Sequence, residues 1–293
     1  MAKRTLVRRE EIKRVIPLAG GRELPLSRPL VMGVLNVTPD SFSDGGKFDT
    51  MDVAVEYALR MAQDGADIID IGGESTRPGA DTVSPEEEER RVLPVITKLL
   101  VESSVPVSID TYHSSVARAA IDAGADIIND ISALRFDQSM AELAARTKVP
   151  VVLMHMLGTP KDMQDDPHYA DCVVEIDNFL DERIEFCHRS GIDKSKIILD
   201  PGIGFGKRLS DNLDIIARLG ELKHFSLPLL VGTSRKSFIE MLHPTGKAPE
   251  KRLGGSIAAM VAAVSNGADI VRVHDVPQTV EALKIVQAVK RAR

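Results

Sequence analysis

Three residues with oxygen acceptors each follow a short apolar run of the sequence. They are Asp110, Asn129 and Asp200. Carboxylate and amide oxygens in a dry pocket suit a flat heterocycle with several N–H donors, because paired hydrogen bonds can then recognise the ring. We therefore expect these residues to bind a nitrogen heterocycle.

A second set of residues is cationic or rich in hydrogen-bond donors. It comprises Arg77, Lys236, Arg272 and His274, with Asn36 as a neutral oxygen ligand. Guanidinium and ammonium groups bind phosphate oxygens, and an amide oxygen is a suitable ligand for Mg²⁺. The two sets together predict a heterocycle that carries a phosphate or pyrophosphate group.

The segment 200–207 is rich in glycine and can be compared with two nucleotide-binding motifs. Gly202, Gly204 and Gly206 do not have the G-x-G-x-x-G spacing, which argues against NAD. Lys207 is not followed by Ser or Thr, so the segment is not a Walker A motif either. We expect its bare backbone to let a planar ring approach closely.

A helix, a glycine turn and a strand recur along the chain. Gly65, Gly124 and Gly267 each follow an Ala-rich amphipathic stretch and begin the pattern Gly-Ala-Asp, which leads into a β-branched run. Glycine fits the position after a helix end, where a positive φ is common. The first two copies lie 59 residues apart (124 − 65), which suits two βα units of roughly 30 residues each.

Eight apolar runs alternate with helical patterns. We expect strands at residues 30–35, 68–71, 107–109, 127–128, 151–154, 197–199, 229–231 and 270–273. A closing helix is expected after residue 276, with Pro277 in its first turn. This alternation predicts an α/β fold, a closed (β/α)8 TIM barrel in which residues 1–293 form a single domain; an open doubly wound sheet is the alternative.

Residues 1–28 do not fit the repeat. We expect them to form a β-hairpin across the N-terminal mouth of the barrel, with its turn at Gly20 and Gly21. The acidic run at residues 86–89 follows Pro85 and is expected to be the solvated first turn of a helix.

Nearly every expected strand ends in polar residues. They are Asn36, Asp70, Glu74, Asp110, Asn129, Asp130, His155, Asp200, residues 233–236, Arg272 and His274. Any one of them could cap a helix, but together they are expected to converge on the mouth where active sites of this fold lie. The loops at residues 36–46 and 74–80 are long enough to act as lids.

Composition narrows the class of protein. The chain has 293 residues, of which 43% are apolar, and a net charge of −6, which does not favour a nucleic-acid binder. No apolar run is long enough to cross a bilayer, and the basic N-terminus lacks the apolar stretch of a secretory signal. Cys172 and Cys187 lie in one helical pattern and are expected to be free thiols in a reducing cytoplasm.

Five segments carry a resemblance to a known family. They are residues 36–46 (NVTPDSFSDGG), 74–79 (ESTRPG), 200–207 (DPGIGFGK), 232–238 (GTSRKSF) and 272–274 (RVH). In this order they resemble the dihydropteroate synthases, folate-pathway enzymes that are the target of sulfonamides. The resemblance extends from about residue 30 to about residue 290.

The resemblance implies a reaction, a cofactor and an assembly. The family condenses (7,8-dihydropterin-6-yl)methyl diphosphate with 4-aminobenzoate, giving 7,8-dihydropteroate and pyrophosphate with the help of Mg²⁺. It implies a homodimer, formed through the C-terminal helices. It implies no nucleic-acid or membrane partner.

The resemblance also implies roles for particular residues. The pterin would be held by Asp110, Asn129, Met154, Asp200 and Lys236. The pyrophosphate would be held by Arg77, Arg272 and His274, with Mg²⁺ on Asn36. The aminobenzoate pocket would be shaped by Thr76, Pro78, Phe205 and Ser237, and Asp44 would face the developing cation. The groups implied in catalysis are Asp44, Arg77, Asp200, Lys236, Arg272 and His274.

Two other functions are weighed against this one. A methyltetrahydrofolate methyltransferase would share the pterin end but has no pyrophosphate to hold, so the cationic set argues against it. A non-catalytic barrel that binds pterins is the second, and the complete set of polar strand ends argues against that.

Overall fold

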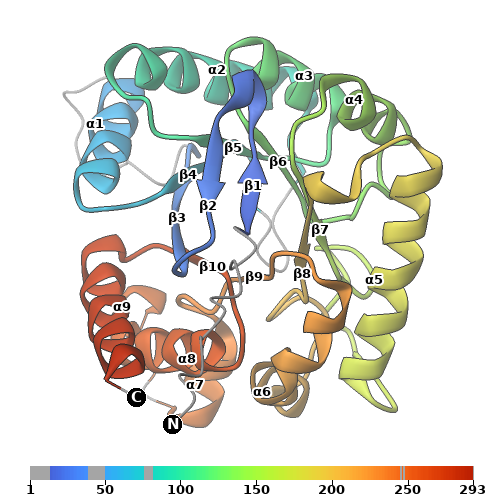
Figure 1. Ribbon diagram of the computed structural model, residues 1–293, viewed down its shortest axis with the longest axis vertical. Coiled ribbons are helices and arrows are strands. Elements are labelled where there is room, and N and C mark those ends of the chain that lie inside the picture. The colour runs from blue at the N-terminus through green and yellow to red at the C-terminus, as the bar shows by residue number, and fades with distance from the viewer. Residues whose placement is uncertain (1–13, 39–49, 76–81, 245, 247, 293) are drawn as a thin grey trace, which may run out of the picture.

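The centre of the molecule is a closed barrel of parallel strands (Figure 1). The computed structural model describes residues 14–38, 50–75, 82–244, 246 and 248–292. The strand order is β8-β7-β6-β5-β4-β3-β10-β9, and Leu199 pairs in parallel with Leu229 just before β9, so the two edges meet. The strands are β3 (Leu30–Asn36), β4 (Ile68–Gly72), β5 (Val107–Asp110), β6 (Ile127–Asp130), β7 (Val151–Met154), β8 (Ile197–Asp200), β9 (Leu230–Val231) and β10 (Ile270–Val273).

Helices follow the strands and surround the barrel (Figure 1). They are α1 (Thr50–Gln63), α2 (Pro85–Glu102), α3 (Ser114–Asp122), α4 (Ser139–Thr147), α5 (Cys172–Arg189), α6 (Leu209–Arg218), α7 (Ser237–Leu242), α8 (Leu253–Ser265) and α9 (Val276–Arg291). The predicted (β/α)8 barrel is confirmed, and the open-sheet alternative is wrong. Pro277 lies in the first turn of α9, as predicted.

The predicted glycine turns join helices to strands. Gly65, Gly124 and Gly267 have φ values of 102°, 109° and 115°, which a residue with a Cβ rarely adopts. The aspartate two residues later in each copy accepts a hydrogen bond from the backbone N–H at the start of a neighbouring strand. These bonds join Asp67 to Val31, Asp126 to Val107 and Asp269 to Leu229.

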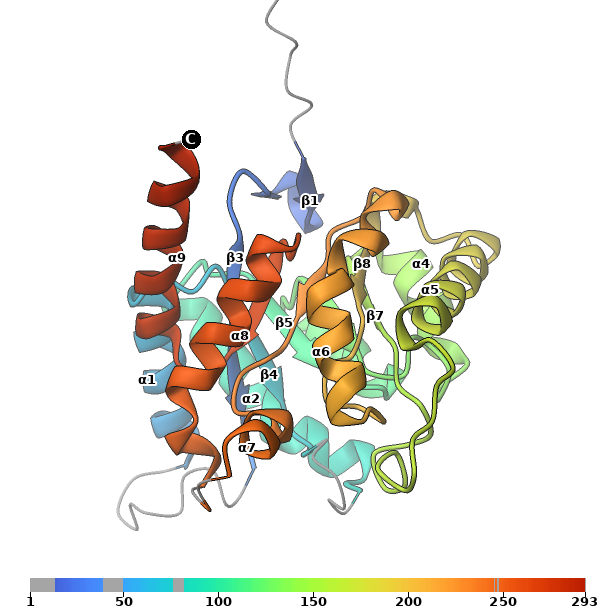
Figure 2. The same ribbon diagram turned by 90° about the horizontal axis from the view of Figure 1, so that it is seen from below.

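A hairpin closes the N-terminal end of the barrel. It comprises β1 (Val15–Pro17), a 3-10 turn (Ala19–Gly21) and β2 (Glu23–Pro25), which confirms the predicted hairpin and its turn. Figure 2 shows it at the opposite end of the molecule from α7. Its neighbouring arginines bind the repeated aspartates, in the pairs Arg14–Asp269, Arg22–Asp126 and Arg28–Asp67.

Side chains along each strand alternate between two cores. On β3, Leu30 and Met32 pack inside the barrel with the hairpin, whereas Val31 and Leu35 pack against the surrounding helices. This two-residue period is the ordinary geometry of a strand. It decides which residues of each strand can reach the cavity inside the barrel.

The acidic run at the start of α2 is not wholly solvated, so that expectation is wrong for Glu88. Ser84 caps the helix by accepting a hydrogen bond from Glu87 N, and Glu86 is exposed. Glu88, however, is 1% exposed, because the helical period turns it toward the barrel together with Val92.

Cys172 and Cys187 are free and buried in α5, as predicted. Burial raises the pKa of each thiol to about 12, so both stay protonated at neutral pH. Among the described helices, none combines the length and the apolar character that a bilayer span needs.

Candidate active site

A cavity of about 380 Å³ opens at the C-terminal ends of the strands. Ten residues predicted from the sequence line it: Asn36, Asp110, Asn129, Met154, Asp200, Phe205, Lys236, Ser237, Arg272 and His274. Asp44, Thr76, Arg77 and Pro78 lie outside the described residues, as does most of each predicted lid. The structure therefore brings to this cavity every described residue to which the resemblance assigns a role. Asp70, Glu74 and Thr233, which the strand-end pattern also placed at the mouth, do not line it.

The strand period explains which polar residues reach this cavity. Val34 and Asn36 on β3 line it, two residues apart, as do Arg272 and His274 at the end of β10. Each pair continues the inward-facing positions of its strand. The residues between them pack outward against helices.

The expected convergence is wrong for His155 and Asp130, which lie one residue after inward-facing Met154 and Asn129. His155 Nδ1 is 3.0 Å from Lys207 Nζ, and its ring packs edge-on against Phe179 of α5. Burial and the nearby Lys207 charge lower the pKa of His155 to about 2. Asp130 is 0% exposed and accepts hydrogen bonds from the backbone N–H groups of Ser132 and Leu134.

Arg272 connects buried acids across the barrel. Its Nε donates to Asp70 Oδ2 at 2.6 Å, and its Nη2 donates to Asp110 Oδ2 at 2.7 Å. Asn129 Nδ2 donates to the same Asp70 oxygen at 3.0 Å. Asp70 is 0% exposed. The guanidinium is therefore fixed in place before any ligand arrives.

The acids of the cavity hold their protons more tightly than exposed carboxyls do. Burial raises the pKa of Asp110 to about 7, against the opposing effect of Arg272. Burial likewise raises the pKa of Asp200 to about 6, although Gly202 N donates to its Oδ1 at 2.7 Å. Burial disfavours the Arg272 charge, but Asp70 and Asp110 outweigh this and raise its pKa above the ordinary value.

The strand order separates the lining residues into two halves. Asp110, Asn129, Met154 and Asp200 stand on β5, β6, β7 and β8, which are consecutive neighbours in the barrel. The residues expected to bind an anion stand on the other side: Asn36 on β3, Arg272 and His274 at β10, and Lys236 after β9. One half is therefore rich in acceptors and the other is cationic, and Arg272 joins them.

Phe205 and Lys236 form one wall. Lys236 Nζ lies 4.1 Å from the centre of the Phe205 ring, a cation–π arrangement. A Cβ on Gly204 would lie 3.1 Å from Lys236 Cδ, so glycine lets the lysine stem pass. Met154 and Met163 pack against Phe205 and complete an apolar surface.

The glycines of segment 200–207 serve chain packing, and Gly202 and Gly204 also line the cavity, where our expectation that a ring approaches them stays a prediction. A Cβ on Gly202 would lie 1.9 Å from His155 O, and one on Gly206 would lie 2.7 Å from Leu157 O. Positions 202 and 206 thus require a residue without a Cβ, because the chain after β7 passes directly against them.

Sequence reasoning missed Pro249 and Arg252, which line the cavity, whereas Ser234 and Arg235 line it as the strand-end pattern predicted. Ser234 Oγ lies 3.0 Å from His274 Nδ1 and so orients that imidazole. Arg235 pairs with Asp275 at 2.7 Å. Arg252 directly precedes α8 and belongs to no motif, so no spacing could have revealed it.

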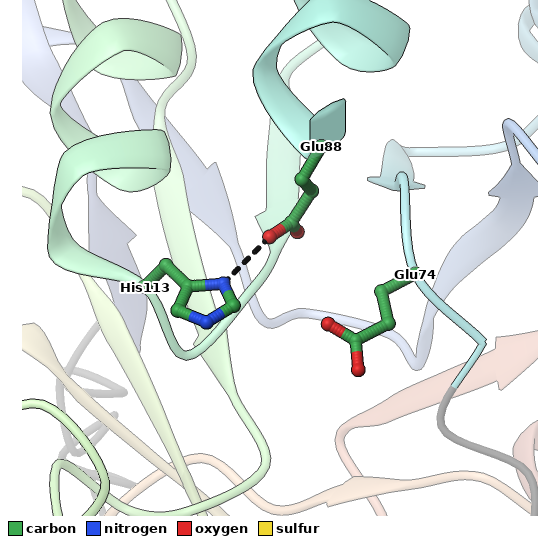
Figure 3. A group of neighbouring side chains, drawn as sticks. All are labelled: Glu74, Glu88 and His113. Carbon is green, nitrogen blue, oxygen red and sulfur yellow. Dashed lines mark hydrogen bonds and ion pairs between the residues drawn. The ribbon is translucent and has the colours of Figure 1, made fainter. Parts of the chain in front are cut away.

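A cluster of acids and an imidazole lies near the mouth (Figure 3). Glu74, Glu88 and His113 offer ligand atoms that all lie within 4.8 Å of one another, which is chemically suitable for a divalent cation. Glu88 Oε2 already accepts from Thr111 and lies 2.9 Å from His113 Nδ1. These residues come from separate elements, so sequence spacing could not predict the cluster.

Within this cluster Glu74 is held by a neighbouring tyrosine. Tyr112 Oη donates to both Glu74 oxygens, at 2.8 and 3.0 Å. Burial raises the pKa of Glu74, whereas the hydrogen bond to Glu88 raises that of His113. The cluster thus fixes the chain directly before residues 76–81.

Comparison with known proteins agrees with this arrangement. The family model described as "Pterin binding enzyme" matches residues 32–274. Dihydropteroate synthase of Escherichia coli (strain K12) is 51% identical over 275 residues, which cover 94% of this chain and 96% of that protein. Xanthomonas albilineans dihydropteroate synthase, solved with 4-aminobenzoic acid, is 49% identical with a TM-score of 0.89, covering 95% of this chain and 98% of that one. The same enzyme in complex with 7,8-dihydropteroate is 46% identical with a TM-score of 0.86, covering 94% and 98%.

A closed barrel with an acceptor-rich and a cationic half at its mouth, matched by this family model, places the chain among the pterin-binding enzymes. Within them the chain belongs to the dihydropteroate synthase family, as the identity over nearly its whole length shows. The methyltransferase and non-catalytic alternatives are set aside on this finding.

We expect Arg272→Met to destabilise the fold, because it leaves Asp70 and Asp110 buried without their shared cation. Loss of one partner of a buried pair costs about 3–5 kcal/mol. Arg60→Met is the control, since Arg60 and its partner Glu56 are 63% and 72% exposed and a pair open to solvent contributes about 1 kcal/mol or less. Urea unfolding at pH 8 measures both, and equal losses of unfolding free energy would contradict the assignment.

Proposed function

We propose that the chain joins (7,8-dihydropterin-6-yl)methyl diphosphate to 4-aminobenzoate, forming 7,8-dihydropteroate. The C–O bond between the methylene carbon and the diphosphate breaks, and a C–N bond to the aromatic amine forms. The amine proton passes to solvent, and pyrophosphate leaves. The observation that carries the proposal is the junction of an acceptor-rich half and a cationic half in the same cavity.

The acceptor-rich half suits the pterin. Asp110, Asn129 and Asp200 offer oxygens to the N–H groups of the ring, with Lys236 as a donor beside them, and Met154 supplies an apolar surface against its face. Asp200 is held in position by Gly202 N. As the C–O bond breaks, positive charge develops on the methylene carbon, and the Asp200 carboxylate stabilises it.

The cationic half suits the leaving diphosphate. Arg272 is fixed through Nε and Nη2, and no hydrogen bond joins its Nη1 to another described residue, which leaves that nitrogen to bind phosphate oxygens. His274, oriented by Ser234, stands beside it. Both stabilise the negative charge that grows on the departing group.

Asn36 fits a role as a magnesium ligand. It ends β3, is half-buried and lines the cavity, and no hydrogen bond joins its side chain to another described residue. Mg²⁺ is commonly held by one or two protein oxygens together with phosphate oxygens, so a single amide is a suitable partner. When bound, the ion would neutralise part of the diphosphate charge.

The second substrate meets Phe205 and Ser237 on the side of the cavity formed by the chain after β8 and the start of α7. Its aromatic amine is a free base at neutral pH, so positioning suffices and no protein nucleophile is needed. Thr76 and Pro78 are proposed to complete this pocket, Arg77 to bind pyrophosphate, and Asp44 to face the cationic carbon.

We expect pyrophosphate release only when both substrates are present, because the amine must capture the carbon as the diphosphate departs. A coupled pyrophosphate assay measures this with each substrate alone and with both. Chelation of divalent ions should lower the rate, and added Mg²⁺ should restore it. Equal release from the pterin diphosphate alone would indicate a hydrolase and overturn the proposal.

The proposed homodimer is supported by an apolar surface on the C-terminal helices. The sequence of α8 contains no charged residue, yet its Ala258 is exposed. On the neighbouring α9, Ile285 and Val289 are 64% and 55% exposed. Exposed apolar area of this kind commonly marks a protein interface.

The proposed location is a reducing cytoplasm. The two free thiols, Cys172 and Cys187, support it.

We expect Ala258→Arg to give a monomer, because it introduces a charge into this surface. Val101→Arg is the matched control, since Val101 is 83% exposed near the end of α2. Sedimentation equilibrium measures the mass of each variant. A dimeric Ala258→Arg protein would place the interface elsewhere.

A further inference from the structure

Lys207 is a buried lysine to which the reaction gives no role, and burial lowers its pKa to about 7. It is 3% exposed and does not line the cavity. Its Nζ donates to Phe205 O at 2.9 Å and to His155 O at 3.3 Å, and it lies 3.0 Å from His155 Nδ1. An ammonium has three donors and here has three acceptors, so its hydrogen bonds are fully used.

The segment that Lys207 binds has little conformational preference of its own. Gly202, Gly204 and Gly206 all have positive φ, at 70°, 80° and 62°. Alternating glycines leave a chain many accessible conformations, so contacts from outside must select one. The segment nevertheless contributes Ile203, Gly204 and Phe205 to the cavity.

Other contacts tie this segment to its surroundings at separate points. Gln164 Nε2 donates to Gly204 O at 2.8 Å, and Tyr169 Oη donates to Gly206 O at 2.6 Å. Asn212 Oδ1 accepts from Gly204 N at 2.6 Å. The backbone of Phe205 donates to Gly202 O at 3.1 Å, and its carbonyl accepts from Lys207, which also binds His155 O outside the segment.

We propose that Lys207 is a positioning residue: it binds the carbonyl groups of Phe205 and His155, fixes the Phe205 ring in the cavity wall, and so sets the affinity for 4-aminobenzoate without touching either substrate. This inference rests on the proposed function. The pterin residues on β5 to β8 are held by strand hydrogen bonds, so we expect their positions to depend less on this tether.

The test replaces Lys207 by Met, which keeps the length of the stem and removes the donors. We expect the KM for 4-aminobenzoate to rise about tenfold, because substrate binding must then order the cavity wall that the lost hydrogen bonds held in place. The kcat and the KM for the pterin diphosphate should change less than about threefold, because binding of one substrate is lost rather than transition-state stabilisation.

Lys196→Met is the matched control. Lys196 Nζ also donates to a backbone carbonyl, that of Pro17 at 2.7 Å, but at the hairpin end of the barrel. It should leave both KM values unchanged. If Lys207→Met altered kcat and both KM values alike, or altered none of them, the positioning role would be overturned.

Tyr169→Phe decides the question if Lys207→Met does not fold. It removes the hydrogen bond to Gly206 O and keeps the buried ring. A selective but smaller rise in the KM for 4-aminobenzoate supports positioning by the tethered segment, and unchanged constants contradict it. Absence of pyrophosphate release from the unaltered protein would instead count against the proposed function.

Discussion

The site depends on carboxylates buried inside the mouth of the barrel and on a guanidinium, that of Arg272, which pairs with two of them. Asp70 and Asp110 both bind Arg272, and Asp200 stands nearby with burial raising its pKa. Charges in such a place are stable only when paired or hydrogen-bonded. The pairing that stabilises the ionised acids in the core also fixes Arg272 beside the expected diphosphate.

The fold supplies this pairing through strand geometry. Parallel strands bring their carboxyl ends to one rim, and the two-residue period turns alternate side chains inward. Strand order then separates acceptors on β5 to β8 from cations on β9, β10 and β3. A ligand with an N–H-rich ring at one end and negative charge at the other fits such a rim.

Much of the fold could be predicted from the sequence, because local patterns determine it. Gly65, Gly124 and Gly267 mark helix ends whose positive φ favours glycine, and the short β-branched runs after them favour buried strands. The inward positions also follow from the two-residue period, which would have excluded His155 and Asp130 had it been applied at the strand ends.

Other features required the tertiary structure. Glu88 lies in an acidic run that looks solvated, and only the packing of α2 shows that it is buried. Arg252 reaches the cavity from a segment without any motif. Lys207 and Phe205 are near neighbours in sequence. The hydrogen bond between them anchors the segment only because Lys207 also binds His155, in the chain that follows β7.

The central claim is that ionised buried carboxylates bind the pterin ring, and calorimetry with 7,8-dihydropteroate tests it. With pKa values of about 6 for Asp200 and about 7 for Asp110, these groups ionise as the pH rises from 5 to 8. Affinity should therefore rise over that range, and Asp200→Asn should weaken it about tenfold at pH 8, with a shallower dependence on pH. An affinity that is independent of pH and unchanged in Asp200→Asn would contradict the account.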